Sequence, residues 1–552
     1  MNTTTHALVA AFALSACVAD PGIGEPDAGV VGPDHRFDPA HVVEVELELD
    51  PADWDRLRTQ TRSWIEIYAA CLAAPFPSPF TYVPATVTVD GVRVEDVAVR
   101  KKGFLGSLSD DKPSLKIGFG DGLTLNNAQQ DPSYLRQCLS YRTFAAAGLP
   151  APRCNFAHVR VNGADLGLYV HVEAVDRAFV ARHFEDDDGN LYEGTYSDFR
   201  DGWTATFELE TNRSANDRRD LDAVVAALER PDAELLAALD EVVAAEPLFA
   251  FWAVEVLITH RDGFAGNANN YFAYHDPTSD RFHFVPWGAD TTFVPGPDPF
   301  GTGLVSVQAG SLAPWRLYQL PAARDRYVAT LRRLLDQIWD EDALEAEIDR
   351  METLIAPIVD PDRSLGHAAS VDQVRQFVRD RRAALVAELD AGPPAWSAPL
   401  NKPPCLETIG TISGSLQTTW GTVLADAFAS GSGALQATIE EVTLDVDAVG
   451  AAAGWDPDHA SRVRLLVVAT LADGTVELVV IGVDAARFRP GSTVPIDGVV
   501  ASGAVYHYSP TTAAYVHVGL VGPGTLEITA AATRDGAPIA ATFQGAVARS
   551  PF

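Results

Sequence analysis

The strongest constraint on the fold is that the spacing of hydrophobic residues changes twice along the chain. From about residue 41 to 175, hydrophobic and polar residues alternate in short runs such as HVVEVELEL, the period of half-buried strands. From 176 to 391, hydrophobic residues recur at the intervals of amphipathic helices. After a proline-rich linker at 392–405, short alternating runs return and continue to residue 552. The sequence therefore predicts an α+β protein with a β-rich lobe, a helical lobe and a separate all-β, sandwich-like domain, for which a barrel is the alternative.

The chain is long and strongly acidic. Its 552 residues are 47% hydrophobic, enough for about three domains with real cores, so wholesale disorder is excluded. They carry 41 Lys and Arg against 75 Asp and Glu, for a net charge of −34. Such a surface repels phosphate backbones, which excludes a general role in nucleic-acid binding. Any anionic ligand must therefore be held by a few local cations.

The first 17 residues resemble the export signal of a bacterial lipoprotein. Residues 7–16 form an apolar run that is too short to span a bilayer as a permanent helix. The sequence LSAC that ends at Cys17 is similar to a lipobox, in which the cysteine is acylated and becomes the mature N-terminus. Residues 18–40 are rich in Gly, Pro and Asp, which predicts a flexible tether. We expect an exported protein anchored to the cell envelope through a lipid on Cys17, with an ordinary secretory signal as the alternative.

The remaining four cysteines predict disulfides rather than a zinc site. Cys71, Cys138, Cys154 and Cys405 are an even number in an oxidising compartment, and none has the spacing of metal ligands. A Cys138–Cys154 bond would close a short loop between a helix and the next strand. Cys405 lies in the proline-rich linker and could tie it back to the body of the protein. Spacing alone leaves the pairing open.

Local patterns predict particular elements in the β-rich lobe. Asp90-Gly91 and Asn162-Gly163 each separate two alternating runs, which is typical of tight hairpin turns. Residues 132–147 have helical spacing and end before Gly148, a plausible helix C-cap. The alternating runs between residues 82 and 120 together predict an antiparallel meander.

The stretch THRDGFAGNANNYF, residues 259–272, carries the side chains best suited to catalysis. Asp262 leaves an apolar helix, a glycine-containing loop follows, and Asn270 stands just before an apolar strand. Twenty residues later, Asp290 follows the second strand of a predicted hairpin. Asp and Asn supply the hard oxygen ligands that suit Mg²⁺ or Mn²⁺. The pattern predicts a phosphoryl-transfer site, in which one Asp orients the attacking hydroxyl while an Asn and a second Asp hold metal on the triphosphate.

The β-rich lobe offers cations for the phosphates of such a substrate. Lys112 and Lys116 lie in KPSLKIGF, where Lys116 alternates with two apolar residues, so its side chain faces the opposite way. A glycine-containing turn from Gly103 to Gly106 precedes this strand. A lysine below a glycine turn can reach phosphates, and the alternative is a lysine that merely lies on an exposed strand face.

Four ordered blocks of the sequence resemble those of the CotH spore-coat kinase family. They are VRKKGFLGSLSDDKPSLKIGF, LTLNNAQQDPSYLRQCLSYRTFAAAGLPAP, VNGADLGLYVHVEAVDRAFVARHFEDDDGNLY and HRDGFAGNANNYFAYHDPTSDRFHFVPWGADTTF. The likeness runs from about residue 42 to 390 and leaves the C-terminal domain uncovered. It implies an atypical protein-kinase-like fold of two lobes, the use of ATP with Mg²⁺ or Mn²⁺, and phosphate transfer to protein hydroxyls.

The resemblance also implies roles for single residues. Asp262 matches the catalytic-loop aspartate, Asn270 the metal-binding asparagine and Asp290 the metal-binding aspartate. Asn267 competes with Asn270, because HRDGFAGN has the Asp-to-Asn interval of ordinary kinases. Lys116 matches the phosphate-contacting lysine.

The expected nucleotide-binding set is completed by a hinge segment and two further residues. Glu173 to Val175 resemble the hinge that meets adenine through backbone groups, and Lys112 and Gly103 flank the expected phosphate position.

Two functions from different classes follow. The first is a protein kinase that transfers the γ-phosphate of ATP to Ser or Thr hydroxyls of a protein substrate outside the cytoplasm. The second is a catalytically inactive kinase scaffold that serves as a surface, adhesion or structural protein, with the C-terminal domain as its binding part.

Overall fold

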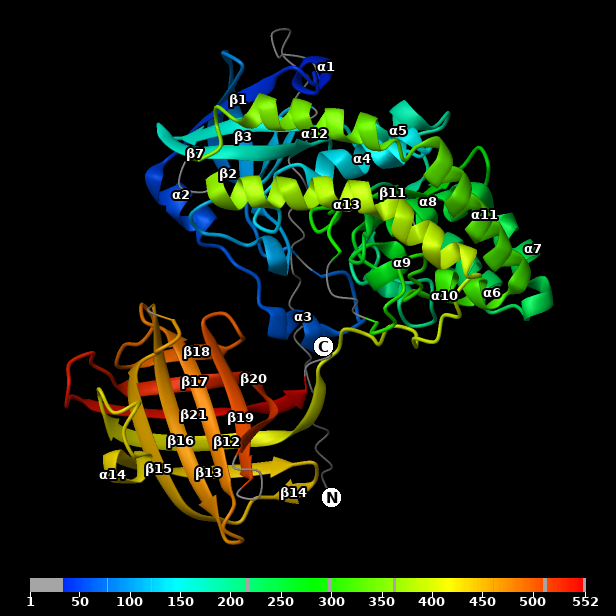
Figure 1. Ribbon diagram of the computed structural model, residues 1–552. Coiled ribbons are helices and arrows are strands. Elements are labelled where there is room, and N and C mark those ends of the chain that lie inside the picture. Colours follow the sequence, from blue (N-terminus) through cyan, green and yellow to red (C-terminus); the bar gives the residue numbers. More distant parts are fainter. Residues whose placement is uncertain are drawn as a thin grey trace, which may run out of the picture.

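The computed structural model describes residues 33–76, 78–120, 122–214, 218–295, 300–360, 364–459, 461–509 and 514–549. These residues form mixed α and β structure, as the sequence predicts, with a barrel and a group of helices beside a large curled sheet of C-terminal residues (Figure 1). The expected export signal, its Cys17 and the tether up to residue 32 lie outside the described residues. Within the part of the chain that is described, no helix has both the length and the apolarity needed to cross a membrane.

Seven strands close into a barrel in the order β1-β2-β3-β4-β5-β7-β6. Both predicted hairpin turns are confirmed, since Asp90, Gly91, Asn162 and Gly163 all have φ between 48° and 82°. The predicted meander is only part of the sheet, because β1 also pairs in parallel with β6 and so closes the barrel. The strands are β1 (Val42–Glu48), β2 (Val83–Val89), β3 (Val92–Lys102), β4 (Ser114–Gly118), β5 (Leu123–Asn126), β6 (Cys154–Val161) and β7 (Ala164–Val172).

The barrel encloses its own core of aliphatic side chains, among them Val45, Val99 and Leu115. Helices α2 (Pro51–Arg58), α3 (Trp64–Ala70) and α4 (Arg136–Ala146) lie outside it, and the short helix η1 (Leu105–Ser107) follows β3. The predicted helix before Gly148 is therefore present as α4.

Residues 33–40 correct one expectation, because they are packed rather than part of a flexible tether. They include helix α1 (Pro33–Arg36). Arg36 is only 1% exposed and donates from Nη1 to the Gly122 carbonyl over 2.8 Å. Asn155 Nδ2 donates to the carbonyls of Arg36 and Asp38, and the Phe37 ring stacks on His171. These contacts fix the segment against the barrel.

The middle of the chain combines a four-stranded sheet with helices. The sheet has the order β11-β10-β8-β9, made of β8 (Asn190–Gly194), β9 (Glu208–Leu209), β10 (Tyr271–Asp276) and β11 (Arg281–Pro286). A large hydrophobic core joins α4 to the helices of this region. The helices are α5 (Arg177–His183), η2 (Thr204–Thr206), α6 (Arg219–Leu228), α7 (Asp232–Val242), α8 (Ala245–Ile258), α9 (Phe264–Asn267), α10 (Leu312–Gln319), α11 (Pro321–Gln337), α12 (Glu341–Ile355) and α13 (Ser364–Asp390).

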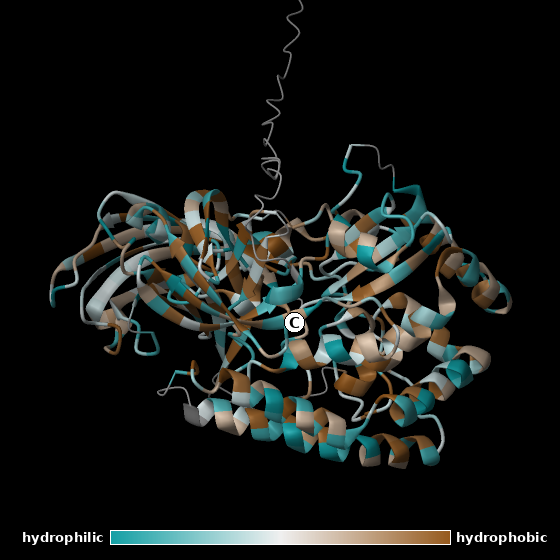
Figure 2. Cartoon of the chain, turned by 90° about the horizontal axis from the view of Figure 1, so that it is seen from above, coloured by the Kyte–Doolittle hydropathy of each residue, from teal (hydrophilic) through white to brown (hydrophobic). Residues whose placement is uncertain are grey.

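The C-terminal residues form one continuous ten-stranded sheet with its own core, and hydrophobic and hydrophilic residues alternate along its strands (Figure 2). The predicted β-rich module is present, as one curled sheet rather than a sandwich of two sheets. A bridge between Trp420 and Ala453 links the end of β12 to β15 and helps to curl the sheet over its core. The elements are β12 (Glu407–Thr419), α14 (Ala427–Ser430), β13 (Gly431–Ile439), β14 (Val442–Thr443), β15 (Val446–Trp455), β16 (Arg462–Leu471), β17 (Val476–Asp484), β18 (Ser492–Ile496), β19 (Ala501–Ser509), β20 (Ala514–Ala530) and β21 (Pro538–Arg549).

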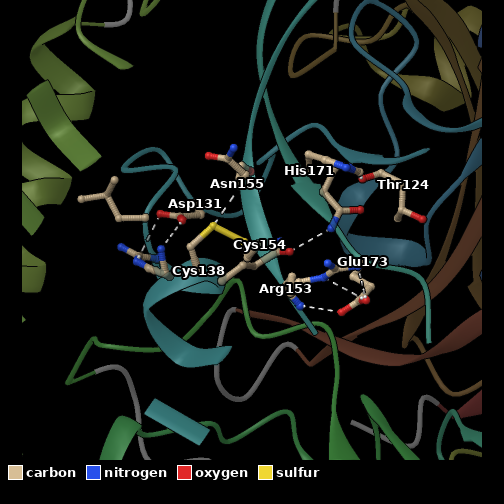
Figure 3. Close-up of a disulfide and its surroundings, with 12 residues drawn as sticks. Thr124, Asp131, Cys138, Arg153, Cys154, Asn155, His171 and Glu173 are labelled. Atoms are coloured by element: carbon tan, nitrogen blue, oxygen red, sulfur yellow. Dashed lines mark hydrogen bonds and ion pairs between the residues drawn. A yellow bond between two sulfur atoms is a disulfide. The ribbon is translucent and has the colours of Figure 1, made fainter. Parts of the chain in front are cut away.

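Two disulfides are present, as the cysteine count predicts. Cys138 of α4 pairs with Cys154 at the start of β6 (Figure 3). Cys71, just after α3, pairs with Cys405 over a sequence separation of 334 residues. The second bond ties the linker to the body of the protein. It also joins the end of α3 to the residues that lead into the C-terminal sheet.

Candidate functional site

The loop that carries Asp262 follows α8, a helix buried on nearly every side. A helix of this kind must satisfy its terminal carbonyls internally. Arg381 of α13 does so, because its guanidinium donates to the carbonyls of Val256 and Leu257. Thr259 then adopts a left-handed conformation with φ of 60° and ends the helix. The chain therefore turns sharply just before Asp262.

Glu255 fixes the far side of this loop. It is the acidic residue within the buried part of α8 and is fully buried. Its carboxylate oxygens accept hydrogen bonds from the backbone N–H groups of Phe264 and Ala265, each over 2.7 Å. A Cβ on Gly263 would lie 2.1 Å from Glu255 Oε1, so only glycine fits there without rearrangement. Sequence analysis missed Glu255, although a lone acid in an apolar helix signals a buried polar contact.

Three asparagine side chains surround the carboxylate of Asp262. Asn267 Nδ2 donates to Oδ1 over 2.8 Å, and Asn269 Nδ2 donates to the same oxygen over 3.2 Å. Asn270 Nδ2 donates to Oδ2 over 2.7 Å and to the Asp262 carbonyl over 3.1 Å. The structure therefore brings Asn267 and Asn270, the two competing candidates, to the same aspartate, and adds Asn269.

Asn270 is the asparagine that also meets the loop after β11. Its φ of 52° is left-handed, and a Cβ on Gly288 would lie 2.3 Å from its Oδ1. The Trp287 N–H donates to the Asn270 carbonyl over 3.1 Å. Asn270 thus joins Asp262 to the segment that ends at Asp290.

Asp290 lies at the end of that segment, in an environment that opposes its negative charge. Burial raises the pKa of Asp290 to about 7 from its ordinary 3.8, and the charges of Asp131 and Asp262 add to the rise. Asp131, labelled beside the Cys138–Cys154 disulfide in Figure 3, is itself buried, and it accepts a hydrogen bond from the backbone N–H of Arg136, the first residue of α4. A cation placed between Asp262 and Asp290 would remove this electrostatic cost.

The outer face of strands β3 and β4 supplies the cations. Leu115 and Ile117 point into the barrel core, so Lys116 faces outward, as the alternation predicts. Lys102 lies on the same face of β3, donates from Nζ to Asn126 Oδ1 over 2.5 Å, and lies 5.6 Å from the centre of the Trp287 ring. Burial lowers the pKa of Lys102 to about 8, against the opposing charges of Glu193 and Asp290.

Lys102 is a site residue that sequence analysis missed. In VRKKG, the first lysine is buried on the other face of β3 and binds the Arg58 carbonyl and Asp110. The two lysines differ only in the face of β3 on which their side chains lie. The register of β3 in the barrel decides which face is which.

Three glutamates face these lysines. Glu193 of β8 pairs in register with Glu208 of β9, and the carboxylates of Glu193, Glu208 and Glu210 offer oxygens within 4.8 Å of one another. Burial raises the pKa of Glu193 to about 8, with further increases from Glu210 and Glu208 and partial relief from Lys102 and Lys116. Helix α4 has no Asp or Glu, so the acidic partners of the lysines come from the four-stranded sheet instead. Sequence alone gave no sign of this pairing.

Other predicted nucleotide-binding residues make structural contacts. Lys112 Nζ is buried and donates to the Leu168 carbonyl over 2.6 Å and to Tyr134 Oη over 3.1 Å. Gly103 has φ of 121°, and a Cβ there would lie 2.6 Å from Ser107 Oγ, so it shapes the turn before η1.

The expected hinge joins the barrel to α5. The Glu173 N–H donates to the Arg153 carbonyl over 2.9 Å, and its carboxylate forms ion pairs with Arg153 and Arg182 (Figure 3). Val175 is 6% exposed and packs in a small core with β8, β10 and β11. The segment is therefore a braced connection between the barrel and the four-stranded sheet.

The donor set fits a divalent cation with a phosphorylated ligand. Asp290 is a carboxylate held in an unfavourable environment, Asp262 raises its pKa further, and Asn270 bridges the two segments. The lysines on β3 and β4 lie on the opposite wall, where they can neutralise phosphate oxygens. Together these groups can bind a metal–triphosphate and place an aspartate beside it.

Comparisons with known proteins agree with this chemistry. The family model for CotH kinase protein matches residues 99–385. Inner spore coat protein H of Bacillus subtilis (strain 168) is 26% identical over 303 residues, which are 50% of this chain and 81% of that protein.

Two solved structures share much weaker similarity. The proinflammatory kinase CtkA of Helicobacter pylori has a TM-score of 0.30 and 9% identity, over 52% of this chain and 92% of that one. The HipA–HipB toxin–antitoxin complex of Shewanella oneidensis MR-1 with operator DNA has a TM-score of 0.29 and 12% identity, over 55% and 66%. These scores are too low to support an inference about this chain.

Proposed function

This chain belongs to the CotH kinase family, and from that premise we propose that it transfers the γ-phosphate of ATP to Ser or Thr hydroxyls of a protein substrate. The observation that carries the proposal is the convergence of Asp262, Asn270 and Asp290 opposite Lys102 and Lys116. On this interpretation the barrel is the N-terminal lobe of an atypical kinase, and the four-stranded sheet with its helices is the C-terminal lobe.

Asp262 would orient the acceptor hydroxyl and take its proton as the oxygen attacks the γ-phosphorus, with ADP as the leaving group. The hydrogen bonds from Asn267, Asn269 and Asn270 hold its carboxylate in one orientation. Asp290 and Asn270 would hold Mg²⁺ or Mn²⁺, which when bound neutralises charge on the triphosphate. Asn270 thus has two tasks, and Asn267 remains the other asparagine able to serve as ligand.

Lys102 and Lys116 would contact the phosphates from the barrel side. In the free protein the charge of Glu193 interacts with both lysines, and that of Glu210 interacts with Lys116. Because burial lowers the pKa of Lys102 to about 8, phosphate binding should restore its full charge.

We also propose that the protein acts outside the cytoplasm, attached to the envelope by a lipid on Cys17. Two disulfides in the folded body support an oxidising compartment. Replacement of Cys17 by Ser should release the protein from the membrane fraction, and membrane retention of that variant would contradict the anchor.

The activity is tested with the chain from residue 18 onward, γ-labelled ATP and Mn²⁺ or Mg²⁺. Asp262→Ala and Asp290→Ala should each lower phosphate transfer by roughly 10²–10⁴-fold, whereas Asp325→Ala, an exposed aspartate of α11, should not. Unchanged transfer in either site variant would refute the assigned roles. No transfer and no nucleotide binding by the folded wild type would support the alternative of an inactive scaffold with a surface or structural role.

A further inference from the structure

Helix α3 connects the barrel to the C-terminal sheet. It lies between the two in Figure 1, contacts β20 of the sheet, and packs against Phe104 and Leu105 of the segment after β3. Ser63 Oγ donates to the Asp497 carbonyl over 2.7 Å, and Trp64 Nε1 donates to the Gly498 carbonyl over 3.1 Å. The Cys71–Cys405 disulfide holds the other end of the helix, so the position of α3 on the sheet is fixed at both ends.

A cavity of about 470 Å³ opens where α3, the loop after β3 and the C-terminal sheet meet. Arg62, Trp64 and Tyr68 line it from the α3 side. Leu105 lies on the barrel side, and Arg462 and Val499 belong to the sheet. No Asp or Glu is among its lining residues, which is notable in a chain with a net charge of −34.

Neither arginine in this cavity has a carboxylate within ion-pair distance among the described residues, although the charges of Glu208 and Glu193 act on Arg62 from farther away. Within the described ranges, the Arg462 guanidinium donates to uncharged groups, namely the carbonyls of Val499 and Gly482 and the hydroxyl of Ser502. The Arg62 guanidinium lies 4.9 Å from the centre of the Phe104 ring, and its buried Nε has no hydrogen-bond partner within the described part of the chain. Burial lowers the pKa of Arg62 to about 10, so it stays charged at neutral pH.

Tyr68 connects the cavity to Asp262. Its ring centre lies 6.3 Å from that of Tyr196, and the two side chains share a hydrogen bond. The Tyr196 N–H donates to Asn269 Oδ1 over 3.2 Å, and Asn269 in turn donates to Asp262. Burial raises the pKa of both tyrosines, and the charge of Asp262 raises it further. Tyr68, which lines the cavity, is therefore linked to Asp262 through Tyr196 and Asn269.

We propose that this cavity binds the carboxylate side chain of an acidic residue in a polypeptide, and so presents a nearby hydroxyl of that polypeptide to Asp262. The presentation of a hydroxyl to Asp262 rests on the proposed kinase function, whereas the binding of the carboxylate does not. An arginine guanidinium matches the two oxygens of a carboxylate, and the guanidinium groups of Arg62 and Arg462 both line the cavity. The rest of the chain repels an acidic peptide, so recognition depends on these two local cations. The C-terminal sheet would then contribute to substrate selection through Arg462.

The first test measures binding and needs no catalysis. A fluorescent peptide with Ala at the acceptor position and Glu on both sides is titrated into the full chain, beside a twin in which every Glu is Gln. Wild type should bind the Glu peptide about tenfold more tightly, as expected for a charge-assisted contact. Arg462→Gln and Arg62→Gln should bind the two peptides nearly equally. Arg462→Lys, which keeps the charge, should retain most of the difference.

The matched control is Arg487→Gln, which removes an exposed arginine of the C-terminal sheet outside the cavity and should keep the wild-type preference. Equal binding of both peptides by wild type, or a full preference in Arg462→Gln, would overturn the proposal. The two arginines lie on opposite walls, so one variant still gives an answer if the other fails to fold.

A second test separates this inference from the proposed function. Serine versions of both peptides are offered with γ-labelled ATP to the same variants. Labelling without a preference for the Glu peptide would leave the kinase function intact and refute the acidic subsite. Selective binding of the Glu peptide without any labelling would support carboxylate binding in the cavity and refute the kinase function.

Discussion

Asp290→Asn should stabilise the metal-free protein above neutral pH, while it removes metal-dependent nucleotide binding. The folded structure raises the pKa of Asp290 from 3.8 to about 7, chiefly through burial. When a carboxyl has a higher pKa in the folded state than in the unfolded state, its contribution to folding stability is fully present below the unfolded pKa, here 3.8. This contribution is lost as the pH rises from 3.8 to the folded pKa of about 7. Above pH 7 the ionised carboxylate is therefore a net cost, which an uncharged amide of the same shape avoids.

The size of this cost follows from the two pKa values. Each unit of difference between the folded and unfolded pKa corresponds to about 1.4 kcal/mol. The difference between 3.8 and about 7 therefore lowers the free energy of unfolding by about 4 kcal/mol at pH 8. Partial exposure of Asp290 to water and relaxation of the loop reduce the amount, so we expect a gain of about 2 to 4 kcal/mol from the substitution. The gain should disappear near pH 4, where both proteins are neutral at this position.

The appropriate assay is local, because a chain with several hydrophobic cores need not unfold in a single two-state step. Hydrogen exchange of amides in β11 and α8 gives the opening free energy of this region between pH 5 and 8.5, in EDTA. Asp325→Asn, on the exposed face of α11, is the matched control and should follow wild type at every pH.

Metal addition gives the second half of the prediction. Mn²⁺ with a non-hydrolysable ATP analogue should stabilise wild type by mass action and leave Asp290→Asn unchanged. If wild type and Asp290→Asn show the same pH dependence, Asp290 does not carry the electrostatic cost that the structure indicates. If both bind metal equally, Asp290 is not a ligand.

Three further predictions concern groups around the site. The affinity of the wild type for ATP should fall by several-fold between pH 7 and pH 9, because Lys102, with a pKa of about 8, loses its proton. In a calorimetric titration, Lys102→Arg should show a flatter pH dependence. A wild-type affinity that does not change with pH would exclude Lys102 from phosphate binding. Glu255→Ala should lower the free energy of unfolding by about 2–4 kcal/mol and remove most of the transfer activity, because two buried N–H groups lose their acceptor. Wild-type rates of hydrogen exchange at the Phe264 and Ala265 amides in this variant would contradict the prediction. Replacing both Cys138 and Cys154 by Ser should lower thermal stability by about 3 kcal/mol, the loop-closure contribution of a 16-residue separation, and an unchanged melting temperature would refute it.

Local sequence signals were sufficient for the elements near the site. The apolar run of α8, the short hairpin of β10 and β11 and the two turns at Asp90-Gly91 and Asn162-Gly163 all follow from side-chain spacing and from residues that tolerate positive φ. The aspartates and asparagines of the site were likewise visible, because they lie within 28 residues of one another, from Asp262 to Asp290. A short segment between a helix and a hairpin keeps such residues close whatever the rest of the fold does.

The opposite wall of the site could not be predicted in this way. Lys102 and Lys101 are equivalent in sequence, and only the register of β3 in the closed barrel turns one toward Asp290 and the other toward Asp110. Glu193 and Glu208 likewise become neighbours only through the pairing of β8 with β9. A strand register is set by contacts with distant strands, so one sequence window does not contain it.

The sequence by itself therefore determined the local elements, the acidic and asparagine-rich loop and the even set of cysteines, because each depends on residues close together in the chain. Only the tertiary structure decided which lysine meets the carboxylates and which glutamates balance it. It also decided that Arg62 and Arg462, four hundred residues apart, share one cavity. Long-range pairing and burial set those relations, and they arise only when the separate segments pack together.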